Sequence, residues 1–332
     1  MRRVSFLRPV SGPTPDIVAA LDAWLGAPAE PEPLVVETSG STGRPKRVVL
    51  SRRAVLASVT ATERRLGGSG RWALALPASY VAGVQVIARS LVAGHAPVLD
   101  GWGDAAYTSL VPTQLHRMLD SPGDTDALRA LRAVLLGGGP IDPALRSRAE
   151  RAGVRVVATY GSAETSGGCV YDGYALDGVA VAIGDGGRIR IGGPTLFDEY
   201  AGDPALTAEV LVDGWFLTSD AGRLDDDGRL HVLGRLDDVV ISGGVNVPTP
   251  AVAARLREHP SVREAEVLGL PDDEWGNRVV AFVVGDLSLD DARAWVAGVH
   301  PRSWAPREVV VLDALPMLDN GKVDRMALRG MA

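Results

Sequence analysis

Cysteine and histidine are scarce in this sequence, and their scarcity excludes whole classes of site. The 332 residues include one cysteine, Cys169, and five scattered histidines. A single cysteine excludes an intramolecular disulfide framework and a cysteine-rich metal site, and it fits a protein of the reducing cytoplasm. Cys169 follows two glycines, but its motif contains no adjacent base. We therefore expect a small buried residue at this position and not a nucleophile.

Long apolar runs and an excess of basic residues are also lacking. The longest apolar-leaning stretch, residues 80–99, is interrupted by Gln85, Arg89 and His95. It is too polar to span a bilayer, so we predict a buried helix followed by a strand. The first 16 residues contain no apolar h-region, so we expect no signal peptide. The net charge of -7 disfavours a protein that binds nucleic acid through its overall field.

One short stretch, ETSGSTGRPKRVVLS (37–51), combines hydroxyls, a flexible backbone and positive charge. This combination suits a loop that binds phosphate. It is not a Walker A motif, because Pro45 precedes Lys46 where that motif has glycine, and Arg47 follows where it has serine or threonine. On composition alone, a polar surface turn remains the alternative.

Strand and helix patterns alternate through the first half of the chain. PLVVET (33–38) predicts a strand that runs into the loop, and residues 51–66 predict a helix capped by Ser51. Residues 16–25 predict an earlier helix with Asp16 as its cap. Further strands are expected within residues 71–77, 108–111, 131–136 and 154–159, with helices between them. This alternation predicts an α/β fold in which helices cover a parallel sheet.

Three polar loops follow predicted strands: the stretch from Thr38, GGGP (137–140) and TYGSAET (159–165). Ligands of parallel sheets gather at the carboxyl ends of the strands, so we expect these loops to converge. After Gly173 the pattern changes to short strands joined by Gly and Asp turns, which predicts a small β unit. From Arg235 onward a compact α+β segment follows. We therefore predict an N-terminal domain of residues 1–234 and a C-terminal domain of residues 235–332.

Five segments in this order resemble the motifs of the adenylate-forming superfamily, which contains acyl-CoA synthetases, peptide-synthetase adenylation domains and luciferases. They are TSGSTGRPK (38–46), TYGSAE (159–164), TSD (218–220), GRLDDVVISGG (234–244) and NGKVDR (320–325). The resemblance runs along almost the whole chain. It implies that a carboxylic acid reacts with ATP to give an acyl-adenylate, and that the thiol of coenzyme A then displaces AMP. Negative charge meets negative charge in the first step, so the site needs cations and hydrogen-bond donors.

The resemblance implies a phosphate and metal subsite. Lys46 would hold the leaving pyrophosphate, and Glu164 would bind Mg²⁺ through a hard carboxylate oxygen. A solvated lysine and an acid at a helix start are the purely structural alternatives. The other residues expected around the phosphates are Thr38, Ser39, Gly40, Ser41, Thr42 and Gly43.

The resemblance also implies a nucleoside subsite. Tyr160 would border the adenine, and Asp220 would accept hydrogen bonds from both ribose hydroxyls. Arg235 would contact ribose or phosphate. A half-buried tyrosine and a turn aspartate are the structural alternatives. The backbone expected beside the adenine is that of Gly138, Gly139 and Gly161.

Two residues of the C-terminal segment complete the implied machinery. Lys322 would bridge the substrate carboxylate and the α-phosphate, although NGKVDR could equally be a solvated turn. Asp237 resembles the hinge at which a mobile C-terminal domain rotates between the two half-reactions.

Within the superfamily, the chain most resembles the short actinobacterial group of 2-succinylbenzoate–CoA ligases of menaquinone biosynthesis. The segments that carry this resemblance are residues 74–94, TSLVPTQL (108–115) and ETSGGCVYDG (164–173). It implies a small-molecule acid as the partner of ATP and coenzyme A, and leaves a homodimer open. The side chains expected to read the acid are Ser79, Tyr80, Thr113 and Gln114, with Val81, Val84 and Leu110 as an apolar slot.

Some residues depart from the superfamily pattern. Ala163 stands where a threonine is usual, so Ser162 or Thr165 would have to supply the missing hydroxyl. Ser79 and Tyr80 stand where related ligases often have histidines. These departures leave two alternatives open: a ligase for another aryl or small acyl acid, and a degenerate nucleotide-binding protein without turnover.

Overall fold

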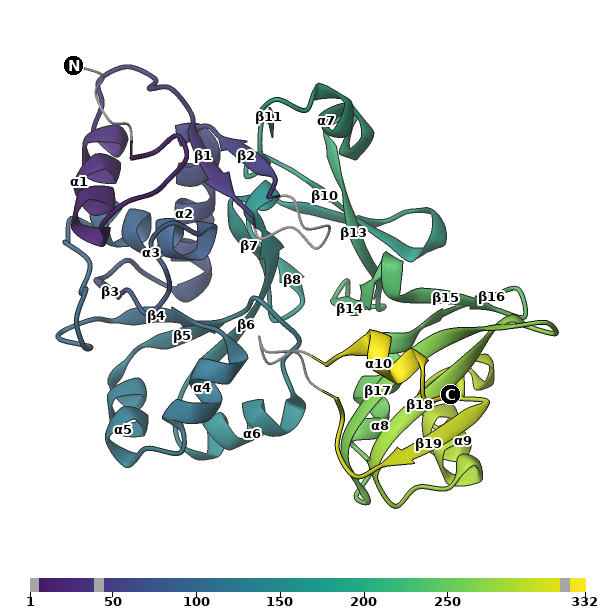
Figure 1. Cartoon of the computed structure of the whole chain (residues 1–332). Coiled ribbons are helices and arrows are strands. Elements are labelled where there is room, and N and C mark those ends of the chain that lie inside the picture. The colour runs from purple at the N-terminus through teal and green to yellow at the C-terminus, as the bar shows by residue number, and fades with distance from the viewer. Residues whose placement is uncertain (1–5, 39–44, 317–322) are drawn as a thin grey trace. The chain divides into compact units, whose positions relative to one another are not determined.

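The computed structural model describes residues 6–38, 45–316 and 323–332, apart from the side chain of Asp237 (Figure 1). Their contacts group the chain into two compact units. Unit 1 comprises residues 1–182, 190–217 and 228–230, and unit 2 comprises residues 183–189, 218–227 and 231–332. The predicted domain boundary between residues 234 and 235 stays a prediction.

The largest sheet of unit 1 has six strands in the order β3-β4-β5-β6-β7-β8. The first four strands are parallel, as the alternation predicts, and the last two continue the sheet in antiparallel fashion. The strands are β3 (Trp72–Ala73), β4 (Tyr107–Leu110), β5 (Ala133–Leu136), β6 (Val156–Ser162), β7 (Gly167–Tyr171) and β8 (Tyr174–Ala175). The connecting helices are α3 (Val81–Val92), α4 (Pro112–Met118), α5 (Pro122–Ala130) and α6 (Pro143–Arg151).

Both faces of this sheet are buried. Successive residues of a strand point to opposite faces of the sheet, so neighbouring residues pack in different apolar clusters. Leu135 of β5 packs with Val86 of α3 in one apolar cluster. Its neighbour Leu136 packs with Leu145 of α6 in another. Figure 1 accordingly shows α2 and α3 on one side of the sheet and α4, α5 and α6 on the other.

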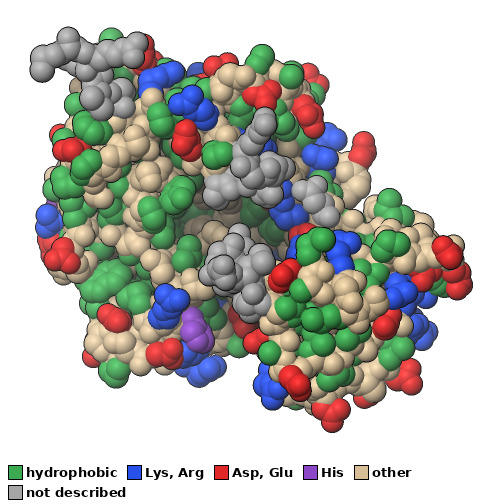
Figure 2. Space-filling view, in the orientation of Figure 1, with side chains coloured by type: hydrophobic (Ala, Val, Ile, Leu, Met, Phe, Trp, Pro, Cys, Tyr) green, Lys and Arg blue, Asp and Glu red, His purple; other side chains and the backbone are tan. Residues whose placement is uncertain are grey.

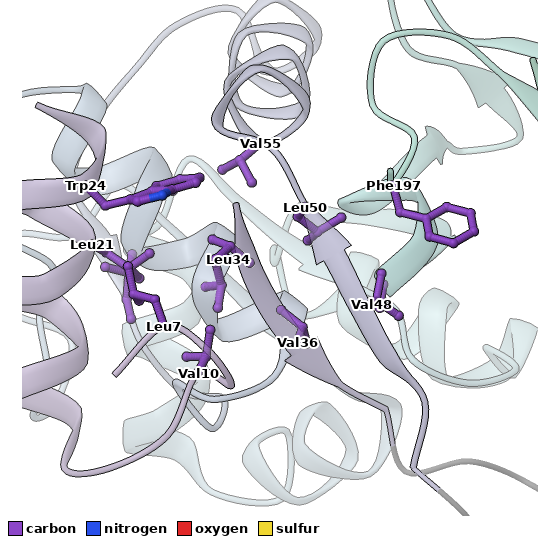
Figure 3. Packing of buried hydrophobic residues seen from close by; sticks show 14 of the residues in the cluster. Leu7, Val10, Leu21, Trp24, Leu34, Val36, Val48, Leu50, Val55 and Phe197 are labelled. Atoms are coloured by element: carbon purple, nitrogen blue, oxygen red, sulfur yellow. The ribbon is translucent and has the colours of Figure 1, made fainter. Parts of the chain in front are cut away.

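A second, antiparallel sheet of unit 1 has the order β1-β2-β11. It consists of β1 (Leu34–Glu37), β2 (Arg47–Leu50) and β11 (Glu199–Tyr200). Helices α1 (Thr14–Leu25) and α2 (Arg52–Leu66) flank it. Figure 3 shows how apolar side chains of these helices and strands meet in one core with Phe197.

Two local predictions for this region need correction. Pro13 and not Asp16 caps α1, because Pro13 has extended backbone geometry while Asp16 lies within the first helical turn. The polar loop does not lead into a helix either, because β2 intervenes. The predicted cap of α2 is confirmed, since the Ser51 hydroxyl accepts a hydrogen bond from the Ala54 amide at 3.4 Å.

The small β unit expected after Gly173 is present. It is a five-stranded sheet in the order β12-β13-β10-β9, with β14 also paired to β13. Its strands are β9 (Ala180–Ile183), β10 (Arg188–Gly192), β12 (Leu211–Val212), β13 (Trp215–Leu224) and β14 (Leu230–Arg235), and α7 (Pro204–Val210) precedes β12.

Unit 2 contains the predicted α+β segment. Its three-stranded sheet, in the order β17-β18-β19, is covered on one face by α8 and α9 and contacts α10 through the cluster around Phe282 and Leu328. The elements are β15 (Val239–Ser242), β16 (Val245–Pro248), α8 (Thr249–Arg257), β17 (Val262–Asp272), β18 (Gly276–Gly285), α9 (Leu289–Ala297), β19 (Glu308–Leu312) and α10 (Arg325–Arg329).

The distribution of charged side chains on the surface and the length of the apolar helices agree with what the sequence predicts. On the face that Figure 2 shows, acidic and basic side chains are interspersed on each unit. No helix in the described part of the chain is both long and apolar enough to cross a membrane.

Candidate active site

A cavity of about 460 Å³ lies in unit 1, where three parallel strands end. Val111 follows β4, Gly137 and Gly138 follow β5, and Gly161 belongs to the end of β6. All four line the cavity. Two of the three loops predicted to converge therefore do so, because the carboxyl ends of neighbouring parallel strands share one edge.

The opposite wall of this cavity comes from α3 and β7. Tyr80 and Val81 stand at the start of α3, and Gln85 and Arg89 follow at intervals of one helical turn. Tyr171 of β7 contributes an aromatic ring. The lining is mostly apolar, and a cavity of this size and character is typical of a small-molecule site.

The strands that flank the polar loop belong to the antiparallel sheet and not to the parallel sheet. The loop connects β1 to β2, whose residues Glu37 and Arg47 pair across an antiparallel hairpin. The Thr38 amide donates to the Lys46 carbonyl at 2.9 Å, which closes the base of the loop. The predicted order of strand, polar loop and helix is therefore wrong, since β2 lies between the loop and α2. The expected phosphate contacts at Ser39, Gly40, Ser41, Thr42 and Gly43 lie outside the described residues.

Lys46 and Glu164 both lie beside one tyrosine, Tyr200. The Lys46 Nζ atom lies 5.2 Å from the centroid of the Tyr200 ring. The Tyr200 hydroxyl donates to Oε1 of Glu164 at 2.7 Å. Burial, with a contribution from Glu164, raises the pKa of Tyr200, so its hydroxyl stays protonated and remains a donor. Three segments far apart in sequence thus place a cation and a carboxylate around one ring.

Glu164 has the donor chemistry that a magnesium site needs. Its side chain is 8% exposed, and a hard carboxylate oxygen suits Mg²⁺. Among the described residues, no three His, Cys, Asp or Glu side chains are grouped so that they could hold a metal ion. Mg²⁺ usually keeps several water ligands and takes others from the phosphates of a substrate. A single protein carboxylate is therefore compatible with that ion.

Neighbouring positions show which hydroxyl could replace the threonine missing at Ala163. The Thr165 hydroxyl is used inside the protein, because it donates to the Gly167 carbonyl at 2.7 Å. The Ser162 hydroxyl lines the cavity and is buried, with no hydrogen-bond partner in the described structure. Ser162 is therefore the better candidate of the two.

The residues predicted to bind the nucleoside are divided between the two units. Tyr160 lies half-buried on β6 between Thr159 and Gly161, which line the cavity. Gly139 is exposed beside the lining residue Gly138. In unit 2, Arg235 Nη1 lies 3.9 Å from Oδ1 of Asp220, so these two predicted ribose contacts are neighbours.

The residues predicted to act as hinge and as catalytic lysine, Asp237 and Lys322, belong to the C-terminal segment. Asp237 lies in a short 3₁₀ turn, Leu236–Asp238, between β14 and β15. In the same unit, Arg325 binds Oδ1 of Asp238 and Oε1 of Glu266, both at 2.6 Å. The start of α10 is thereby tied to this turn. Lys322 lies outside the described residues.

Of the four residues expected to bind the acid, two line the cavity and two do not. Tyr80 lines the cavity and is 48% exposed. Gln114 also lines it, but its amide accepts from the Val111 amide at 3.0 Å and donates to the Ala75 carbonyl at 2.8 Å. Ser79 and Thr113 are half-buried and exposed, respectively, and neither belongs to the cavity lining.

Two of the three residues predicted for the apolar slot line the cavity, and Cys169 is buried as expected. Val81 and Leu110 line the cavity, while Val84 is fully buried in the neighbouring core. Cys169 is completely buried, and burial raises the pKa of its thiol to about 12. It therefore stays protonated at neutral pH and is not a nucleophile.

Sequence reasoning missed Tyr200, Gln85 and Arg89 as site residues. No sequence motif marks Tyr200, because it reaches Glu164 only through the pairing of β11 with β2. Gln85 and Arg89 do carry a sequence signal: they are polar residues four apart in a helix whose other buried residues, apart from Ser90, are apolar. The predicted buried helix is confirmed, but the sequence analysis did not assign its polar residues to the site.

Comparison with known protein families gives two matches to this chain. Residues 34–194 match the AMP-binding enzyme family, and residues 251–322 match the AMP-binding enzyme C-terminal domain. Among curated proteins, a probable 2-succinylbenzoate–CoA ligase of Mycobacterium tuberculosis (strain H37Rv) is 46% identical over 319 residues, covering 89% of this chain and 83% of its own length.

Solved structures give the same picture of the fold. An amide bond synthetase of Marinactinospora thermotolerans matches 90% of this chain and 68% of its own, with a TM-score of 0.76 and 29% identity. The o-succinylbenzoate CoA synthetase of Bacillus subtilis, in complex with the acyl-adenylate intermediate OSB-AMP, matches 89% of this chain and 68% of its own, with a TM-score of 0.74 and 27% identity.

Proposed function

The chain belongs to the AMP-binding enzyme family, and we propose that within it the protein is a 2-succinylbenzoate–CoA ligase of menaquinone biosynthesis. In the first half-reaction, one carboxylate of the acid attacks the α-phosphorus of ATP and pyrophosphate leaves. In the second, the thiol of coenzyme A attacks the acyl carbon and AMP leaves. The chain needs no nucleophile of its own for either step.

The observation that carries this proposal is the largely apolar cavity beside the glycines of the β5 and β6 loops. An aromatic diacid needs apolar walls for its ring and a few polar groups for its carboxylates, and the cavity offers both. The 46% identity to a ligase named for this acid supports the same substrate.

The phosphates would lie near Lys46 and Glu164. Lys46 would hold the leaving pyrophosphate with Thr38 and the loop that follows it, and Glu164 would hold Mg²⁺. Mg²⁺ supplies charge neutralisation on the phosphates when it is bound. The Tyr200 ring fixes the position of the Lys46 ammonium, and the Tyr200 hydroxyl orients the Glu164 carboxylate. Preorganised charges of this kind act without reorganisation during the reaction.

The nucleoside and the acyl group would be held by the remaining predicted residues. Tyr160 and the glycines after β5 and β6 would border the adenine, and Asp220 with Arg235 would bind the ribose. Lys322 would bridge the reacting carboxylate and the α-phosphate. Rotation at Asp237 would then remove Lys322 and admit coenzyme A. We keep a reducing cytoplasm as the predicted compartment and a homodimer as an open state of assembly.

A screen of pyrophosphate release tests this function and its alternatives. The panel holds 2-succinylbenzoate, benzoate, small acyl acids and fatty acids, each with and without coenzyme A. A ligase for another acid would release pyrophosphate with that acid instead. A degenerate nucleotide-binding protein would bind ATP and release no pyrophosphate with any member of the panel.

A further inference from the structure

Two residues after Glu164, the backbone adopts a left-handed conformation at a serine. Ser166 has a φ of 52° and a ψ of 39°, and it follows the short 3₁₀ turn Ala163–Thr165. This conformation is strained for a residue with a Cβ atom, and glycine is the usual choice. Three described residues other than glycine have a positive φ, and of these Ser166 alone is buried, the others being Asp172 and Asp213. A buried serine under this strain points to a use for its hydroxyl.

Hydrogen bonds of Ser166 join this turn to two distant parts of unit 1. The Ser166 hydroxyl donates to the Thr195 carbonyl at 2.8 Å. The Ser166 carbonyl accepts a hydrogen bond from the hydroxyl of Ser58, a residue of α2, at 3.1 Å. Both serines are fully buried, so water does not compete for these bonds. Glycine at position 166 would fit the backbone better, but it could not make the bond to Thr195.

The segment from Thr195 to Tyr200 also contacts Glu164 itself, at two points. The Phe197 amide donates to the Glu164 carbonyl at 2.9 Å. The Tyr200 hydroxyl donates to Oε1 of Glu164 at 2.7 Å. One segment therefore holds the main chain of Glu164, its carboxylate and, through Ser166, the end of the turn that carries it. Three hydrogen bonds between the same two segments leave the Glu164 backbone little freedom.

Other polar groups of the turn are used to shape the turn and not to orient it. The Ser162 amide donates to the Thr165 hydroxyl at 2.9 Å. The Thr165 hydroxyl in turn donates to the Gly167 carbonyl at 2.7 Å. Both bonds stay within residues 162–167. Among the described hydrogen bonds, those that dock the turn on α2 and on residues 195–200 come from Glu164 and Ser166.

We propose that Ser166 is a positioning residue for the magnesium ligand: its hydroxyl docks the Glu164 turn on residues 195–200 and so fixes the direction of the Glu164 carboxylate. This inference rests on the proposed function for the role of Glu164. Ligating carboxylates are held by outer hydrogen-bond partners, and the loss of such a partner costs about 10- to 100-fold in metal affinity or activity. Ser166 acts through Glu164 and takes no part in bond making.

Ser166→Gly separates positioning from folding. Glycine adopts a φ of 52° without strain, which offsets stability lost with the hydroxyl, so Tm should stay within about 4 °C of wild type. The Mg²⁺ concentration that half-saturates pyrophosphate release, with 2-succinylbenzoate and saturating ATP, should rise about 10-fold. The same rise should appear without turnover, in the Mg²⁺ concentration that half-saturates the increase of Tm caused by ATP.

Two further variants complete the test. Ser58→Ala removes the bond from α2 and keeps the bond to Thr195, so it should raise the Mg²⁺ requirement by a smaller factor; it decides the matter if Ser166→Gly folds poorly. Thr108→Val is the matched control, because the Thr108 hydroxyl is fully buried in β4 and donates to the Ala73 carbonyl at 2.9 Å. Its loss should lower Tm and leave both Mg²⁺ half-saturation values unchanged.

The outcomes separate this inference from the proposed function. If wild type releases no pyrophosphate with 2-succinylbenzoate, but Ser166→Gly raises the Mg²⁺ requirement of the ATP-induced increase in Tm, the positioning role stands and the choice of acid fails. If wild type uses the acid and Ser166→Gly keeps the wild-type Mg²⁺ requirement, the positioning role is wrong and the function stands. A lower Tm with an unchanged Mg²⁺ requirement, as in Thr108→Val, would mean that Ser166 only stabilises the fold.

Discussion

The Tyr200 hydroxyl donates a 2.7 Å hydrogen bond to Oε1 of Glu164, across 36 positions of sequence. The same tyrosine ring faces the Lys46 ammonium at 5.2 Å. Glu164 is the proposed magnesium ligand and Lys46 the proposed pyrophosphate ligand. A single residue of a two-residue edge strand therefore contacts both the carboxylate that would hold Mg²⁺ and the ammonium that would hold pyrophosphate.

Replacement of this hydroxyl should weaken adenylation. Tyr200→Phe removes the donor to Glu164 and keeps the ring beside Lys46. We expect kcat/KM for ATP to fall ~10- to 100-fold, the range for a lost hydrogen bond to a charged group. The concentration of Mg²⁺ that half-saturates the rate should rise. The same Mg²⁺ dependence in Tyr200→Phe and wild type would show that Tyr200 does not position Glu164. Tyr200→Leu also removes the ring beside Lys46, so it should lower the affinity for ATP further.

Lys322 should act in one half-reaction only. Lys322→Ala should abolish acid-dependent release of pyrophosphate, because the charge that bridges the carboxylate and the α-phosphate is lost. Formation of the thioester from pre-made acyl-adenylate and coenzyme A should be largely spared. Equal loss of both activities would contradict this role and would indicate misfolding or a shared function.

The turn at Asp237 should govern the exchange between half-reactions. Asp237→Pro fixes φ near -65° and should hold the C-terminal domain in one orientation. One half-reaction should then fall far more than the other, as measured by pyrophosphate release and by thioester formation. Asp237→Ala, which keeps the backbone free, is the control and should retain both. Normal rates in the proline variant would place the hinge elsewhere.

The buried thiol should make stability sensitive to alkaline pH. Burial raises the Cys169 pKa from 9.0 to about 12, so the unfolded thiol ionises first. The contribution of the protonated thiol to the free energy of unfolding is fully present below pH 9. It is lost as the pH rises towards 12, and the free energy of unfolding then falls by up to about 1.4 kcal/mol per pH unit. Denaturant unfolding of wild type and Cys169→Ala from pH 8 to 10.5 should show the wild type losing stability faster. Parallel curves would contradict the assignment.

The alternation of elements could be predicted from sequence because it rests on local patterns. Leu135 and Leu136 are both apolar, and a strand buried on both faces needs that. The Ser51 cap is likewise a local signal. The short strand β2 was missed because RVVL runs directly into the Ser51 cap of α2, so no turn marks the end of the strand.

The site was less predictable, because its contacts are non-local. Glu164 and Lys46 could be named from their motifs, but the residue that joins them, Tyr200, reaches them only through β-sheet pairing. The opposite case is Arg89, which the sequence shows as a polar residue in an apolar helix. Only the surroundings of Arg89 in the folded chain show that no protein acceptor meets its Nε atom.

The central claim is most directly tested by the preference among acids at saturating ATP and coenzyme A. We predict that kcat/KM for 2-succinylbenzoate exceeds that for benzoate and for a medium-chain fatty acid by several orders of magnitude, because a site built for a second carboxylate leaves its donors unpaired with such analogues. Thioester formation should require coenzyme A, and AMP should accumulate with it. A higher kcat/KM for benzoate or for the fatty acid would contradict the assignment.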